Sequence, residues 1–589
     1  MCGIFGYFNR QGVSLPDESV RTMGEAIRHR GPDDQGVFAF GGGALGNQRL
    51  SIIDLAGGHQ PFVSDDGQIV VVQNGEIFNH VELAAELAGT AHACRTHSDT
   101  EVLLRLYEAE GIGFLSKLNG MFAIAIYDAR EKAMYIARDR IGVKPLYVHD
   151  DGTLLAFSSE IKSLVKAGVA PRTLDEVAVH HYLTFNYVPA PHTMYRTVRH
   201  LMPGHLLKIT RESTTTERWW HLGDVAPVHG RSEADWIEEF NAIIDDAVRL
   251  RLRSDVPFGA FLSGGVDSST VVGLMARHMA EPVKTFCIGF DDPRFDESMF
   301  AQAAADRFGT LHRMEKVEPD MLSLWPMATY HCDQPHGDIS FLPTYRVSAL
   351  AAADVKVVLT GDGADELFAG YDKYREFFGQ PCVSNMGDDA FRRAYFDSIS
   401  LFSGAAKNRL YSDAAAGRLG QIDSFDVAAP YFDDARHHDR INQALYLDMQ
   451  LLLSGNNLVK PDRMGMAVSL EARTPFLDYR MMEFAFRMPG ELKLKDGVTK
   501  YLYKKAVEPL IGTDLAYRKK QMFTVPVGEW FRDAKRDYCR ERISYLLDHS
   551  DLINPVQAHR LVDEHCAGTA NHTRELRALI ALSHWVEGN

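Results

Sequence analysis

Short apolar runs, separated by turns rich in Gly and Asp, dominate the first third of the chain. Runs of strand length lie at residues 4–8, 69–73, 121–127, 134–137, 146–149 and 154–157. Helical patterns at 81–87 and 100–108 interrupt these runs. Strands at this density predict antiparallel sheets packed face to face, with helices on the outside.

The pattern changes after residue 210. Residues 211–231 lack apolar periodicity and include three consecutive threonines, so we expect a linker there between domains at 2–210 and 232–589. The second domain begins with an amphipathic helix near Ser232 and continues with strands alternating with helices. The expected strands are 256–262, 285–290 and 355–360, and the expected helices are 270–279 and 300–308. This alternation predicts a parallel α/β sheet, followed by a mostly helical remainder.

Composition narrows the class of protein. The chain has 589 residues, of which 46% are hydrophobic, which is typical of a globular protein. Its net charge of −16 makes general binding to nucleic acid or to an anionic membrane unfavourable. No apolar run approaches the ~20 residues of a membrane span, and the N-terminus lacks the basic region of a secretion signal. Seven scattered cysteines without a C-x-x-C pair argue against a disulfide scaffold or zinc knuckle, and we expect a cytoplasmic protein. We expect the adjacent His437 and His438 to be solvated.

A glycine-rich loop, SGGVDSS at residues 263–269, follows the first strand of the second domain. Its adjacent glycines and the start of the next helix can form an anion-binding nest, and its serines can donate to phosphate oxygens. Asp267 would repel phosphate unless a cation lay between them, so we assign it to Mg²⁺. A second loop, GDGADE at 361–366, follows another strand and would reach the same edge of the sheet, although alone it could equally be a solvated turn.

The first loop is neither G-x-x-x-x-G-K-[ST] nor G-x-G-x-x-G. It resembles the pyrophosphate loop of ATP pyrophosphatases, which cleave ATP between the α and β phosphates to adenylate a substrate. A plain strand–turn–helix connection rich in small residues is the alternative. All seven positions would rarely agree in that case, so we favour the ATP-binding interpretation.

Cys2 directly follows the initiator methionine. Because aminopeptidases remove methionine before small residues, we expect Cys2 to be the mature N-terminus, with a thiol and a free α-amine on one residue. An α-amine has an unperturbed pKa of about 8, so it can act as a base at neutral pH. One residue could therefore supply both nucleophile and base, although a cysteine placed there by chance would look the same.

The neighbouring motifs favour the catalytic interpretation. Their order along the chain is CGIFG at 2–6, RHRGPD at 28–33, RLSI at 49–52, NGEIFNH at 74–80 and SDTE at 98–101. This set resembles the class II glutamine amidotransferases, and together with SGGVDSS it resembles glutamine-hydrolysing asparagine synthetase over most of the chain. The resemblance implies a four-layer αββα N-terminal-nucleophile hydrolase sandwich, of α+β class, followed by an α/β Rossmann-like ATP-pyrophosphatase domain.

The resemblance also implies roles in the first domain. Cys2 would attack the side-chain amide of glutamine, while the Asn74 side chain and the Gly75 N–H group form an oxyanion hole. Arg49 would bind the α-carboxylate of glutamine, and Glu76 and Asp99 would bind its α-ammonium. For Arg30, an ion-pair role on the surface and a role in a channel remain equal alternatives.

In the second domain the implied ligands are ATP and Mg²⁺. Asp267 and Asp365 would bind Mg²⁺, Lys500 would stabilise the adenylate-forming transition state, and Asp362 would take a proton from attacking ammonia. The residues implied to contact ATP are Leu262, Ser263, Gly264, Gly265, Asp267, Ser268, Ser269, Ile288, Gly289 and Gly361.

Two departures from the family pattern fall on the acceptor site. Asp362 stands where typical members carry glutamate, so a carboxylate is retained. Residues 336–341 read HGDISF, without the arginine of the usual TTIRAS segment. An aspartate substrate needs a cation for its second carboxylate, so either Lys460 or Arg463 supplies it or the acceptor is different.

The sequence thus predicts an ATP-dependent amide ligase of asparagine-synthetase type, with ammonia passing from Cys2 to a β-aspartyl-adenylate. The alternatives are the same chemistry on another carboxylic acid, such as a cell-wall or secondary-metabolite precursor, and a non-catalytic scaffold. An intact Cys2 argues against a β-lactam-forming relative, because those characteristically lack it. The resemblance also implies a homodimer.

Overall fold

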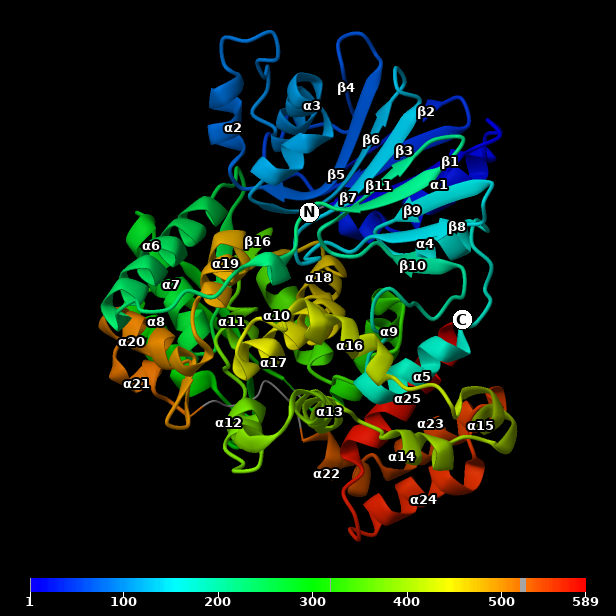
Figure 1. The fold of residues 1–589 in the computed structure, drawn as a ribbon, viewed down its shortest axis with the longest axis vertical. Helices are drawn as coiled ribbons and strands as arrows, with labels where there is room; N and C mark the ends of the chain where they lie inside the picture. Colours follow the sequence, from blue (N-terminus) through cyan, green and yellow to red (C-terminus); the bar gives the residue numbers. More distant parts are fainter. Residues whose placement is uncertain (1, 318, 520–525) are drawn as a thin grey trace.

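The computed structural model describes residues 2–317, 319–519 and 526–589 and places the first domain above the second in the view of Figure 1. Two six-stranded antiparallel sheets form the first domain. The first sheet contains β10 (Val198–His200), β8 (Tyr147–Asp150), β9 (Leu154–Ser158), β1 (Cys2–Asn9), β3 (Gly43–Arg49) and β2 (Asp34–Phe40), in that order. The second contains β12 (Thr214–Arg218), β11 (His205–Ile209), β7 (Ala133–Arg138), β6 (Gly120–Asp128), β5 (Ile69–Ile77) and β4 (Phe62–Val63).

The two sheets pack against each other through a buried apolar layer. Ile4 and Leu45 from the first sheet share this layer with Val70, Val72 and Ala123 from the second. Helices α1 (Asp17–Glu25) and α4 (Ile161–Lys166) cover the outer face of the first sheet, and α2 (His80–Leu87) and α3 (Asp99–Glu110) that of the second. The predicted four-layer αββα sandwich is confirmed.

A five-stranded parallel sheet lies at the centre of the second domain. Its order is β15 (Leu311–Val317), β14 (Lys284–Phe290), β13 (Phe258–Phe261), β16 (Val357–Leu359) and β17 (Glu471–Arg473). Helices α7 (Val266–His278) and α8 (Ser298–Phe308) contact one part of this sheet, and α10 (Phe341–Ala352) contacts β14 and β15. The order reverses between β13 and β16, where such sheets bind ligands at the carboxyl ends of their strands. The predicted α/β domain is confirmed.

The strands that the sequence did not reveal are short, polar or glycine-containing. β3 carries two glycines and three polar residues, yet it is fully buried between β1 and β2. β15 lies at the edge of its sheet and is largely exposed, so its polar composition hid it. β12 lies inside the segment expected to be a linker and pairs with β11, so the irregular connection begins after Arg218.

One expectation about the surface is wrong. His437 is exposed as expected, but His438 is buried and packs edge-on against Phe486. Burial lowers the pKa of His438 to about 4, which keeps the ring neutral at physiological pH.

The carboxyl-terminal part is helical and returns to the first domain. Helices α23 (Arg536–His549), α24 (Pro555–Cys566) and α25 (Thr573–Gly588) pack together, and α25 also contacts α9 (Trp325–Cys332). Helix α5 (Glu176–Phe185) lies beside α25 (Figure 1), and Tyr182 Oη donates a 2.7 Å hydrogen bond to the carbonyl oxygen of Ala578. None of the described helices is both long and apolar enough to cross a lipid bilayer.

Arg30 joins the two domains through buried ion pairs. Its Nη1 and Nη2 atoms lie 2.9 and 3.0 Å from the carboxylate of Asp462 on α18 (Val459–Met466), and Nη1 lies 3.0 Å from Glu160 Oε1. The side chain is fully buried, so the expected alternative of a surface ion pair is wrong. Its Nε also donates to the carbonyl oxygen of Cys2 at 3.1 Å, which ties the domain contact to the first strand.

We expect Arg30→Met to destabilise the protein strongly, because it leaves Asp462 and Glu160 buried with less compensating charge. Breaking a buried pair on one side typically costs about 3–5 kcal/mol. Urea unfolding followed by tryptophan fluorescence would measure the loss. The matched control is Arg21→Met, which removes an exposed pair with Glu18 and should stay within about 0.5 kcal/mol of wild type. Equal stability of the two variants would contradict the structural role.

Candidate active sites

The first candidate site surrounds Cys2 at the start of β1. Cys2 lies opposite Arg49 in the β1–β3 pair, and its backbone nitrogen donates a 3.2 Å hydrogen bond to Asn74 Oδ1 on β5. Burial raises the pKa of the Cys2 thiol, partly opposed by a hydrogen bond from the backbone of Leu50. A thiol with a raised pKa needs a base to become a nucleophile, and in a mature chain starting at Cys2 the adjacent nitrogen would be the α-amine.

Asn74 and Gly75 occupy a position that the backbone restricts. Asn74 Nδ2 lies 3.3 Å from Ser159 Oγ, so both ends of the amide are held near Cys2. Gly75 has φ +142°, and a Cβ there would lie 1.9 Å from the carbonyl oxygen of Met121. Only glycine fits this close strand approach, which explains the Asn-Gly sequence at the predicted oxyanion hole.

The predicted glutamine-binding residues lie around the thiol. Arg49 donates hydrogen bonds to the carbonyl oxygens of Ile53 and Asp54 at 3.1 and 2.8 Å, and no ion pair within the described residues engages it. The charge of Arg49 lowers the pKa of the Cys2 thiol, and the charge of Glu76 raises it. Asp99 accepts 3.0 Å hydrogen bonds from Ile77 N and Gln73 Nε2, which hold its carboxylate beside Glu76.

Two residues of the second domain also reach this site. Nη2 of Arg473, on β17, lies 3.6 Å from Glu76 Oε2. Nε of the same arginine lies 2.6 Å from Oε1 of the second residue, Glu471. Burial and the neighbouring carboxylates of Glu471 and Asp99 raise the pKa of Glu76. The contact between Arg473 and Glu76 could not be predicted from the sequence, because these two residues lie about four hundred positions apart.

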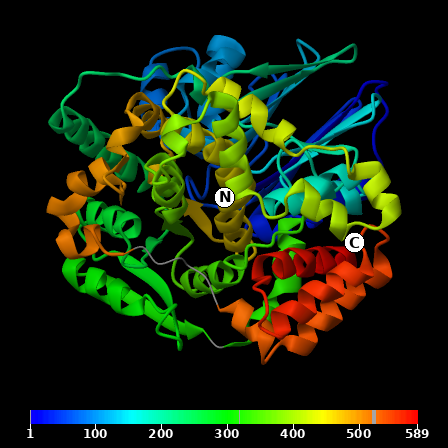
Figure 2. The ribbon, with the colours of Figure 1, turned by 60° about the horizontal axis from the view of Figure 1, so that its bottom comes forward.

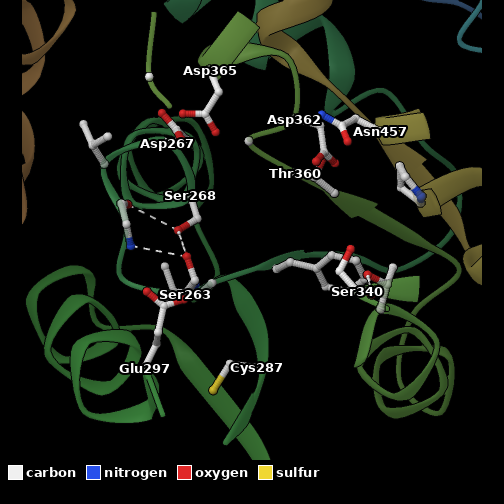
Figure 3. Close-up of a pocket in the computed structure, with 18 of the residues that line it drawn as sticks. Ser263, Asp267, Ser268, Cys287, Glu297, Ser340, Thr360, Asp362, Asp365 and Asn457 are labelled. Carbon is white, nitrogen blue, oxygen red and sulfur yellow. Dashed lines mark hydrogen bonds between the residues drawn. The ribbon is translucent and has the colours of Figure 1, made fainter. Parts of the chain in front are cut away.

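The second candidate site is a cavity of about 480 Å³ at the switch point of the parallel sheet (Figure 3). The SGGVDSS loop forms one wall: Ser263 Oγ and Ser268 Oγ lie 3.1 Å apart, and Gly265 N donates to Ser263 Oγ at 3.3 Å. Gly264 has φ +68°, and a Cβ there would lie 2.3 Å from the backbone of Phe300. The loop can therefore pack this tightly only with glycine, and helix α7 begins within the motif, at Val266.

Most of the predicted ATP-contacting residues line this cavity. They are Leu262, Ser263, Gly265, Asp267, Ser268, Ile288 and Gly361. Gly264, Ser269 and Gly289 do not line it: Gly264 packs against Phe300, and Ser269 is fully buried in α7. Phe261, Phe286 and Phe290 supply an apolar wall that suits a flat aromatic base.

Lys500 holds together the two aspartates that the sequence assigned to Mg²⁺. Its Nζ lies 2.6 and 2.7 Å from the carboxylate oxygens of Asp267 and 2.7 Å from Asp365 Oδ1. A Cβ at Gly370 would lie 1.9 Å from Asp365 Oδ1 and 2.2 Å from Lys500 Cε, so this glycine makes room for the pair. The two acidic loops and Lys500 therefore meet at one point, as Figure 3 shows for the aspartates.

The donor set fits Mg²⁺ together with a substrate. The described residues contain no cluster of three or more His, Cys, Asp or Glu side chains able to hold a metal alone. Mg²⁺ commonly binds through one or two carboxylates plus substrate phosphates, and Asp267 and Asp365 supply two beside the predicted pyrophosphate loop.

Asp362 lies across the cavity from Ser263 and Ser268 (Figure 3). Its Oδ2 accepts a 2.7 Å hydrogen bond from Thr360 Oγ1. Burial raises the pKa of Asp362, an effect that the nearby charge of Lys460 opposes. A carboxylate with a raised pKa is a better proton acceptor, as the predicted role requires.

Sequence reasoning missed two arginines of the cavity. Arg518 reaches it from beyond α20 (Tyr501–Ile511) and pairs with Glu297 at 2.6 Å, and its guanidinium lies over the Phe300 ring. Arg577 reaches it from α25. Neither belongs to a recognisable motif, because only the fold brings these segments to the cavity.

Comparisons with known proteins agree with this arrangement. Residues 1–220 match the family model described as a glutamine amidotransferase domain, and residues 239–587 match the model described as asparagine synthase. The fold and the family models thus define a glutamine amidotransferase domain joined to a synthetase domain built on a parallel sheet. The chain belongs to the asparagine synthase family.

Similar proteins cover nearly the whole chain. Glutamine-hydrolysing asparagine synthetase 1 of Bacillus subtilis (strain 168) is 33% identical over 99% of this chain and 96% of its own. A putative glutamine-hydrolysing asparagine synthetase of Mycobacterium tuberculosis (strain H37Rv) is 31% identical over 99% and 97%. Among solved structures, the glutamine phosphoribosylpyrophosphate amidotransferase of Bacillus subtilis matches with 20% identity and a TM-score of 0.29, covering 53% of this chain and 65% of its own.

Proposed function

We propose that the protein is a glutamine-hydrolysing asparagine synthetase, which converts glutamine, ATP and aspartate into glutamate, asparagine, AMP and pyrophosphate. One observation carries the proposal: the SGGVDSS loop, the GDGADE loop and Lys500 converge on one cavity, in a chain whose other domain buries Cys2 against Asn74. Family membership and relatives with this activity in their names support the same reaction.

In the first site, the Cys2 α-amine would take the thiol proton as the sulfur attacks the side-chain amide of glutamine. Asn74 Nδ2 and the Gly75 N–H group would stabilise the oxyanion, and such donors each typically contribute about 3–4 kcal/mol. Collapse of the tetrahedral intermediate would release ammonia and leave a thioester on Cys2, which water then hydrolyses to glutamate. Arg49 would hold the α-carboxylate of glutamine, and Asp99 with Glu76 would hold its ammonium group.

In the second site, the serines and backbone N–H groups of the SGGVDSS loop would hold the pyrophosphate portion of ATP. The carboxylate of the acceptor attacks the α-phosphate, forming an acyl-adenylate and releasing pyrophosphate. Lys500 would offset charge that develops on the phosphates. Asp267 and Asp365 would hold Mg²⁺, which supplies charge neutralisation for the phosphate groups when bound.

Ammonia must reach the adenylate without protonation in bulk water. The contact between the domains is buried around Arg30, Asp462, Glu76 and Arg473, and we propose that ammonia crosses it. Asp362 would then accept a proton as ammonia attacks the acyl carbon and AMP leaves. A cytoplasmic location suits these substrates, and a homodimer remains a prediction.

The test uses glutamine labelled with ¹⁵N in its side-chain amide. We expect labelled asparagine, glutamate, AMP and pyrophosphate in equal amounts when aspartate is supplied. If the protein hydrolyses glutamine and cleaves ATP with another carboxylic acid but not with aspartate, that acid is the acceptor instead. The absence of both reactions would support a non-catalytic protein.

A further inference from the structure

Six polar residues form the end of the cavity that lies away from the phosphate loop. We call this the acceptor end, and its residues are Asp338, Ser340, Thr344, Asp362, Lys460 and Arg577. Figure 3 shows Ser340 and Asp362 across the cavity from Ser263 and Ser268. A substrate carboxylate lying between Asp362 and the loop would place the rest of its molecule at the acceptor end.

Arg577 is a cation of this end whose side chain the described residues do not fully satisfy. Its Nε is buried and donates no hydrogen bond to any group in the part of the chain that the structure describes. Burial lowers the pKa of Arg577, and the charge of Asp338 is the largest influence that opposes this effect. Because a buried N–H group of a guanidinium without an acceptor is costly, this arrangement indicates a site that an anionic ligand completes.

The other two candidate cations are already engaged. Lys460 Nζ donates a hydrogen bond to Ser340 Oγ at 3.2 Å. The charge of Lys460 also acts to lower the pKa of both Asp338 and Asp362. Arg463, which the sequence offered as a candidate, does not line the cavity. It lies 2.8 Å from Glu160 and 3.4 Å from Asp333 in the buried contact between the domains, so it does not serve the acceptor.

Asp338 offers a fixed negative charge beside Arg577. Ser340 N donates to its Oδ1 at 2.9 Å, and Asn456 Nδ2 donates to its Oδ2 at 3.0 Å. Asn456 belongs to the π-helix Met449–Asn457, an irregular element of the kind often found at functional sites. The charge of Lys460 and these hydrogen bonds outweigh burial and lower the pKa of Asp338 to about 2, so it is ionised at neutral pH.

We propose that Arg577 determines acceptor specificity by binding the carboxylate that is not adenylated, while Asp338 binds the acceptor's ammonium group. An arginine contributed by the carboxyl-terminal helix thereby replaces the one missing from residues 336–341. A guanidinium suits this task because it can donate two parallel hydrogen bonds to a carboxylate. The proposal rests on the proposed adenylation reaction and assigns the acceptor class as amino acids with two carboxylates.

The test compares acceptors that differ by one group, in the full-length protein with ammonium chloride as nitrogen donor. The panel is L-aspartate, L-glutamate and meso-2,6-diaminopimelate, with β-alanine lacking the second carboxylate and succinate lacking the ammonium group. AMP formation is measured for wild type and for Arg577→Gln, Arg577→Lys and Asp338→Asn. Arg574→Gln is the matched control, because Arg574 lies exposed on the same helix.

We expect the wild-type protein to favour an amino dicarboxylate. Arg577→Gln should raise the KM for that acceptor at least about tenfold without changing glutaminase activity. Arg577→Gln should also lose the preference over β-alanine, Arg577→Lys should recover part of it, and Asp338→Asn should lose the preference over succinate. The proposal would be overturned if Arg577→Gln kept the preference over β-alanine. It would also be overturned if the wild-type protein used β-alanine as efficiently as aspartate. AMP formation with none of the acids would instead overturn the adenylation reaction itself.

Discussion

Replacing Cys2 by alanine should abolish glutamine-dependent asparagine formation and leave ammonia-dependent formation near the wild-type rate. The variant lacks the thiol that is proposed to form the thioester, so glutaminase turnover should fall by at least about 10³-fold, as when other covalent nucleophiles are removed. The second site keeps its geometry, since Cys2 lies in the other domain. Glutamate release and asparagine formation would be measured with glutamine and then with ammonium chloride.

The control for this experiment is Cys94→Ala. Cys94 is a partly buried thiol in the same domain, and burial raises its pKa to about 11, so it is a poor nucleophile at neutral pH. The control should retain both activities. Persistent glutamine-dependent synthesis in Cys2→Ala would show that another residue hydrolyses glutamine. Loss of the ammonia-dependent reaction as well would show that the substitution disturbs the contact between the domains.

Much of each site could be predicted because its chemistry is local in sequence. The SGGVDSS loop carries its glycines, serines and aspartate within seven residues, and its place after a strand follows from the apolar run before it. Cys2 and the Asn74-Gly75 pair are likewise readable as short motifs. The layers of both domains followed from the spacing of apolar runs, because alternation and helical periodicity reflect which face is buried.

The parts that escaped prediction depend on contacts between distant segments. The sequence placed Lys500 and two aspartates in one site but could not show that a single ammonium bridges both carboxylates. Arg577 lies more than two hundred residues after Asp338, and only the packing of α25 brings it to the cavity. Strand β3 was missed because its polar residues are buried by partners on both sides, which overrides their own preferences.

Removing the Lys500 ammonium should slow adenylation more than it weakens ATP binding. Lys500→Met keeps most of the length of the side chain but removes the charge that lies between Asp267 and Asp365. A preorganised cation at developing phosphate charge is worth roughly 10²–10³ in kcat, so AMP formation should fall by at least about that factor. The same substitution leaves two carboxylates that repel each other, and a divalent cation can relieve this repulsion.

The apparent affinity for Mg²⁺ should therefore rise in Lys500→Met while kcat falls, and titrating Mg²⁺ at saturating ATP would show both effects. Lys505→Met is the matched control: it lies on α20 just beyond Lys500, its exposed ammonium pairs with Glu233, and it should leave adenylation unchanged. Glutaminase activity should persist in both variants, because the Cys2 site is intact. A loss in Mg²⁺ affinity with unchanged kcat would instead mean that Lys500 only holds the aspartates in place. Opposite changes in kcat and Mg²⁺ affinity would thus separate stabilisation of the transition state from positioning of the two carboxylates.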